Sequence, residues 1–60
     1  SGSAVTNVLR QRGMIETNIR SLTRMATEAA ARGDMYRFEQ YYTKIKALQA
    51  TLAQLPIYWL

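Results

Sequence analysis

The sequence contains neither cysteine nor histidine. Without cysteine the chain has no disulfide bond and no thiolate metal site. Without histidine it lacks the commonest metal ligand and the commonest general base. Its acidic residues are scattered along the chain at Glu16, Glu28, Asp34 and Glu39. We therefore predict no catalytic residue, no metal site and no cofactor, and we do not expect an enzyme.

Long apolar runs are also missing. A membrane-spanning helix takes about 20 consecutive apolar residues, and no stretch of this chain approaches that length. The chain also does not open on the basic and apolar pattern of a signal peptide. Residues 1–3, Ser-Gly-Ser, resemble the remnant of an expression tag and are left out of the fold prediction. We expect a soluble protein of the cytoplasm with no membrane partner.

The chain is short and basic. Its 60 residues form one domain at most, and a domain of this size buries only about 60% of the surface that its unfolded chain exposes. Because disulfides and metals are excluded, oligomerisation is the remaining way to gain stability. Eight Arg and Lys against four Asp and Glu give a net charge of +4. That balance fits nucleic acid, an acidic protein or simply a well-hydrated surface.

Residues 4–32 carry apolar side chains at the alternating spacing of three and four residues that is typical of an amphipathic helix. Seven of the eight positions are apolar, with Arg12 as the exception: Val5, Val8, Ile15, Ile19, Leu22, Ala26 and Ala29. Gly13 leaves two interpretations open. In one the helix is continuous and Gly13 allows close packing or a mild bend; in the other, residues 4–12 form a separate arm. The unbroken phase of the pattern favours a continuous helix over 4–32.

Residues 35–55 repeat the pattern without an exception. The apolar positions are Phe38, Tyr41, Ile45, Leu48, Leu52 and Leu55. Pro56 ends this helix, because proline disfavours the α conformation of the residue before it. Between the two segments, Gly33 is suited to close the first helix in a left-handed conformation, and Asp34 is suited to cap the second. Such a short link makes consecutive helices antiparallel neighbours.

The sequence therefore predicts an all-α antiparallel two-helix hairpin over residues 4–55, with a turn at 33–34. Flanking residues such as Leu9, Met14 and Met25 make both apolar stripes wider than one neighbouring helix covers. Two hairpins packed face to face would form a four-helix bundle, so we expect a homodimer, with a different protein as the alternative partner. The predicted residues of this core and dimer interface are Val8, Ile15, Ile19, Leu22, Phe38, Tyr41, Ile45, Leu48, Leu52 and Leu55.

Residues 56–60 form an apolar C-terminal tail that ends in four large side chains. Two interpretations stay open: the tail folds back over the open end of the hairpin, or it serves as a docking peptide for a partner.

Two functions are compatible with these features. The first is a small non-enzymatic adaptor or regulator that binds another protein, since Tyr, Trp, Met and Arg are enriched at interfaces. Its candidate contacts are Tyr36, Tyr42, Tyr58 and Trp59. The second is a basic module that binds nucleic acid by contacting phosphates through Arg10, Arg20 and Arg24.

The length of the chain and its basic helical hairpin, from Val8 to Leu55, resemble the small all-helical accessory proteins that lambda-like temperate bacteriophages encode in their early regions. The resemblance implies a regulatory factor that acts in the host cytoplasm on replication, transcription or development through protein contacts. It assigns a role to no individual residue.

Overall fold

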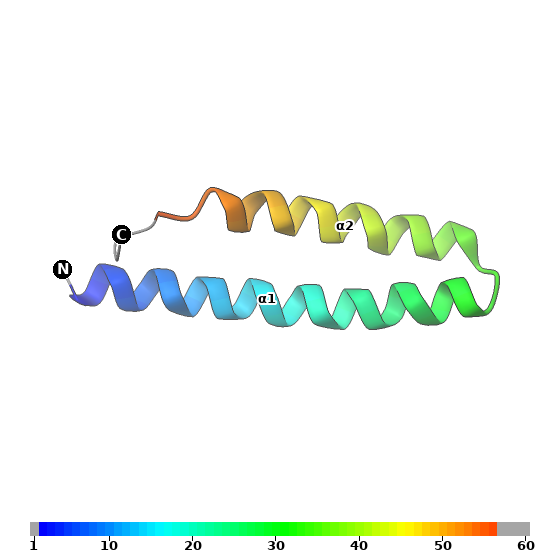
Figure 1. Ribbon diagram of the computed structural model, residues 1–60, viewed down its shortest axis with the longest axis horizontal. Helices are drawn as coiled ribbons and strands as arrows, with labels where there is room; N and C mark the ends of the chain where they lie inside the picture. Colours follow the sequence, from blue (N-terminus) through cyan, green and yellow to red (C-terminus); the bar gives the residue numbers. More distant parts are fainter. Residues whose placement is uncertain (1, 57–60) are drawn as a thin grey trace.

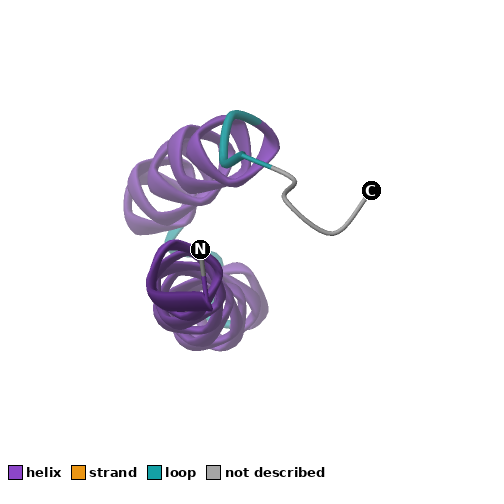
Figure 2. Cartoon of the chain, turned by 90° about the vertical axis from the view of Figure 1, so that its left-hand side faces the viewer, coloured by secondary structure: helices purple, strands orange, loops and turns teal. Residues whose placement is uncertain are grey.

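The structure, a computed structural model, describes residues 2–56, which form two helices: α1 (Gly2–Ala31) and α2 (Met35–Ala53). The helices run antiparallel, side by side, and a tight turn joins them at one end of a rod (Figure 1). Figure 2 looks along the rod and shows them as two adjacent columns. The prediction of an all-α two-helix hairpin is confirmed. The molecule extends 48 × 15 × 14 Å.

The turn has a specific hydrogen-bonded form. The backbone N–H of Asp34 donates to the carbonyl of Ala29 at 2.9 Å, and the N–H of Gly33 donates to the carbonyl of Ala30 at 3.0 Å. This pair of bonds is a Schellman motif, which requires a left-handed residue, and Gly33 has φ of 76°. Asp34 then caps α2: its Oδ1 accepts from the backbone N–H of Arg37 at 3.2 Å, and its Oδ2 lies 3.4 Å from the Nε of the same arginine.

Helix α1 is continuous through Gly13. The alternative of a separate arm over residues 4–12 is therefore wrong. A Cβ added at Gly13 would meet no atom within 4 Å, so this glycine is not a site of close packing inside the hairpin either. The helix begins at Gly2, so it includes residues that the sequence analysis set aside.

Helix α2 ends at Ala53, two residues before the predicted end at Leu55. The last turn tightens to hydrogen bonds between residues three apart. The N–H of Gln54 donates to the carbonyl of Thr51 at 3.0 Å, and the N–H of Leu55 donates to the carbonyl of Leu52 at 3.3 Å. Because Leu55 precedes proline, it cannot adopt the α conformation comfortably, and the helix unwinds before reaching it. With 30 residues in α1 and 19 in α2, α1 extends about 16 Å past the end of α2 (Figure 1).

The core lies along the line where the two helices meet. Its buried residues are Val8, Ala26, Ala29 and Ile45. The other large residues of the predicted core are half-buried: Ile15, Ile19, Leu22, Phe38, Tyr41, Leu48, Leu52 and Leu55. We call the residues of these two sets the seam. The seam is therefore narrow, and most of its large side chains still expose part of their surface.

Candidate interaction surface

A groove runs along one flank of the seam, between the two helices. A hollow of about 400 Å³ is lined by Asn18, Ser21, Leu22, Met25, Lys44, Ala47 and Leu48. A second hollow of about 360 Å³ is lined by Gln11, Met14, Ile15, Asn18, Thr51 and Leu55. Asn18 lines both hollows, so they form one continuous surface. We call it the Asn18 groove.

The chemistry of the Asn18 groove is nearly neutral. Lys44 is the one ionisable residue in the two linings. The α1 side is a stripe from Gln11 to Met25, in which Met14 remains 63% exposed. The α2 side contributes the small Ala47 and Thr51, both exposed. A surface that is long, weakly polar and open in this way can accept another helix, but it holds no group suited to chemistry.

An aromatic cluster lies on the other flank of the seam. The rings of Phe38 and Tyr42 stack with centroids 5.9 Å apart, and the Nζ of Lys46 lies 5.3 Å from the centroid of the Tyr42 ring. Tyr42 is 49% exposed and Met35 is 51% exposed. Both contacts favour this orientation of the Tyr42 ring, and about half of its surface stays exposed.

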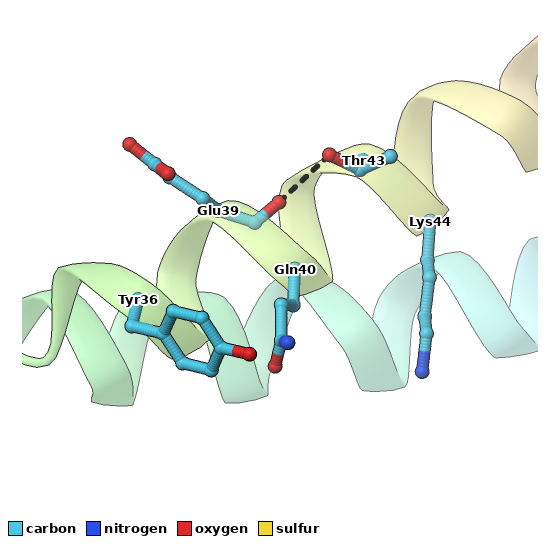
Figure 3. A pocket seen from close by; sticks show the side chains of 5 residues that line it. All are labelled: Tyr36, Glu39, Gln40, Thr43 and Lys44. Carbon is cyan, nitrogen blue, oxygen red and sulfur yellow. Dashed lines mark hydrogen bonds between the residues drawn. The ribbon is translucent and has the colours of Figure 1, made fainter.

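Tyr36 occupies a different face of α2. Residues six positions apart point about 120° away from each other on a helix, so Tyr36 and Tyr42 do not line one groove, although the sequence analysis put both among the partner contacts. Tyr36, 73% exposed, instead lines a shallow hollow together with Glu39, Gln40, Thr43 and Lys44 (Figure 3). In that hollow the hydroxyl of Thr43 donates to the carbonyl of Glu39 at 2.9 Å.

The three arginines of the nucleic-acid hypothesis are exposed on α1. The guanidinium of Arg20 donates to the Oγ1 of Thr17 at 3.1 Å, and that of Arg24 donates to the Oγ of Ser21 at 3.4 Å. Arg10 borders a hollow with Gly13, Met14, Thr17 and Asn18. All three charges are thus available on the surface of α1, on the half of the helix that faces away from the seam.

The remaining predictions concern the ends of the chain and metal chemistry. Tyr58 and Trp59, with the rest of the predicted tail beyond Pro56, lie outside the described residues. Within residues 2–56, no group of three or more potential ligands is placed to hold a metal ion. Neither of the two described helices has the length and apolarity needed to cross a membrane.

Sequence reasoning found the seam but not the groove beside it. Asn18, Ser21, Lys44 and Thr51 belong to no apolar pattern, so they were not singled out. A signal was present, because Met14, Asn18, Ser21 and Met25 recur at helical spacing with no charge among them.

Comparison of the chain with models of protein families, with curated proteins and with solved structures gives no match. The resemblance to phage accessory proteins consequently stays a prediction from the sequence.

Proposed function

We propose that this chain is a non-enzymatic protein-binding module that acts as a helical homodimer. The observation that carries the proposal is the large surface that the hairpin leaves open. The chain of 6.9 kDa exposes 4564 Å², whereas a compact monomer of that mass exposes about 4000 Å². Its radius of gyration is 14.4 Å, against about 10 Å for a compact domain of this length.

The open surface is large enough for a stable interface. A standard interface takes about 800 Å² from each partner, a small part of the 4564 Å² that the chain exposes. The half-buried residues of the seam supply the apolar part of this surface. Covering them with a second hairpin would complete a four-helix core, and the two-fold dimer is the commonest arrangement in which a chain covers itself.

The protein-binding role rests on what a dimer of this kind leaves exposed. Helical spacing places Met35 and Tyr42 on the flank opposite the Asn18 groove, and Tyr36 lines a separate hollow on α2. Aromatic residues and methionine are enriched where proteins bind one another. A regulatory role in the cytoplasm, as the resemblance to phage accessory proteins implies, belongs to the same proposal.

The first experiment is the molar mass of the full chain in solution, measured by sedimentation equilibrium over about a thousandfold range of concentration. We expect twice the chain mass of 6.9 kDa at the upper end and a decline towards the monomer on dilution. A single chain mass at every concentration would contradict the homodimer, and the candidate partner for the seam would then be a different protein.

Binding to nucleic acid is the second candidate, and the exposure of Arg10, Arg20 and Arg24 favours it. Contacts to phosphates release counterions, so affinity falls steeply as salt rises. Fluorescence anisotropy with a labelled duplex over a salt series tests this, with the triple Arg→Gln variant as the comparison. Binding that vanishes in the triple variant and weakens with salt would support a phosphate-binding surface; no binding at low salt would remove the candidate.

A further inference from the structure

We infer that the second copy of the chain docks in the Asn18 groove, with the two-fold axis passing close to Asn18. This inference rests on the proposed homodimer and goes further by assigning the flank and the register of the contact. The opposite flank, the outer face of α1 and the outer face of α2 then stay free for other partners.

The distribution of charge separates the two flanks. The two linings of the Asn18 groove hold one charged side chain, Lys44, and Arg10 borders an adjoining hollow that shares Met14 and Asn18 with the groove. Helical spacing places Glu16, Arg20 and Lys46 on the opposite flank, over the same length of the rod. Removing a charge from water is costly unless it is paired with good geometry. Covering the groove with a second hairpin therefore costs less desolvation of charged groups than covering the opposite flank would.

The charged residue that the groove does contain lies where it is tolerated. Lys44 also lines the shallow hollow of Tyr36 and Gln40, and in Figure 3 its side chain extends from α2 over the ribbon of α1. Its aliphatic stem can cover apolar surface there while its ammonium reaches water at the edge of the contact. Glu28, Arg32 and Arg37 lie nearer the turn, beyond the residues that line the groove. The neutral surface thus has a defined length of 15 residues along α1, from Gln11 to Met25.

The register follows from the midpoint of this surface. A two-fold interface brings the same patch of both copies together, so its central residue faces its own equivalent. Asn18 is the midpoint of the α1 lining, and it belongs to both hollows. With the two-fold axis perpendicular to the rod, α1 packs antiparallel against α1 of the second copy, an arrangement that the helix dipoles favour. An asparagine amide both donates and accepts hydrogen bonds, so two of them can pair there and fix the register.

The first test compares two alanines of the same helix. Ala47 lines the groove, whereas Ala50 is exposed and points away from the seam by helical spacing. Ala47→Arg places a bulky second charge beside Lys44 in the interface, while Ala50→Arg makes the same change in solvent. Sedimentation equilibrium should show the dimer weakened about tenfold or more by Ala47→Arg, and about twofold or less by Ala50→Arg.

Because so small a hairpin depends on its partner for stability, far-UV circular dichroism accompanies these measurements to detect unfolding. A loss of helicity confined to Ala47→Arg and reversed at high protein concentration supports the inference as well, since both variants change the helix propensity equally. If the wild type dimerises and Ala47→Arg weakens it no more than Ala50→Arg does, the groove is not the interface, although the homodimer stands. A monomeric wild type removes both proposals.

The second test uses the absence of cysteine from the chain. Asn18→Cys introduces a single thiol at the expected two-fold axis, and Ala50→Cys introduces one far from it. A disulfide forms only when the two Cα atoms come within about 7 Å. With oxidised glutathione, covalent dimers should accumulate for Asn18→Cys and not for Ala50→Cys, as measured on non-reducing gels. Equal cross-linking of both variants would overturn the proposed register.

Discussion

Two glycines show how far the meaning of one residue type depends on its backbone conformation. Gly33 is the one residue with positive φ in the described part of the chain, at 76°, and two backbone hydrogen bonds of the turn depend on its conformation. Gly13 lies inside α1, where an added Cβ would meet nothing within 4 Å. The sequence alone predicted the role of Gly33, because glycine before a capping aspartate is a typical helix end. It left that of Gly13 open, since packing space is a tertiary property.

The same substitution should therefore have opposite effects at these two positions. Gly13→Ala removes the entropic cost of an interior glycine and should raise the free energy of unfolding by about 1 kcal/mol, or Tm by roughly 4–8 °C. Gly33→Ala forces a Cβ into the left-handed region and should lower it by about 1 kcal/mol. Thermal denaturation at one fixed concentration measures both. Two shifts of the same sign would show that one of the backbone conformations is wrongly assigned.

At the scale of the helices, the seam was accessible to sequence reasoning because spacing of three and four residues defines one side of a helix without any knowledge of the partner. All of its predicted members are buried or half-buried. The end of α2 was less accessible: Pro56 signalled a stop, but how far the helix unwinds before it depends on the hydrogen bonds of Gln54 and Leu55. Arg12 is half-buried despite its charge, which fits its position among the apolar residues of the pattern.

Ile45 is the residue on which the pairing of the helices should depend most. It is the most buried residue of α2, with 8% of its surface exposed. Ile45→Asp would bury an unpaired charge and should cost several kcal/mol, which exceeds what a hairpin of this size can lose. We expect loss of the helical circular dichroism signal and of the dimer together. Thr43→Asp introduces the same charge at an exposed position of the same helix and should leave both nearly unchanged. A helical, dimeric Ile45→Asp protein would contradict the seam.

For the whole molecule, the limit of sequence reasoning was the choice of flank. Periodicity gives the direction of the seam, but both flanks carry large residues: Met14 and Met25 on one, Met35 and Tyr42 on the other. Which flank forms a groove depends on how α2 packs against α1. That packing is determined by the side chains of both helices. The Asn18 groove, with one charge in its linings, is therefore a property of the assembled hairpin rather than of either helix.

The stability of the molecule should depend on its own concentration. If folding and dimerisation are coupled, a tenfold rise in concentration stabilises the dimer by about 1.4 kcal/mol, which for two chains of this size raises Tm by roughly 5 °C. The dependence should survive high salt, because the groove contains few charges and apolar burial is not screened. Calorimetric scans over a concentration series, at low and at high salt, measure this. A Tm that does not change with concentration would mean that the hairpin folds alone. A concentration dependence that disappears at high salt would place the contact on the charged flank of Glu16, Arg20 and Lys46 instead of in the groove.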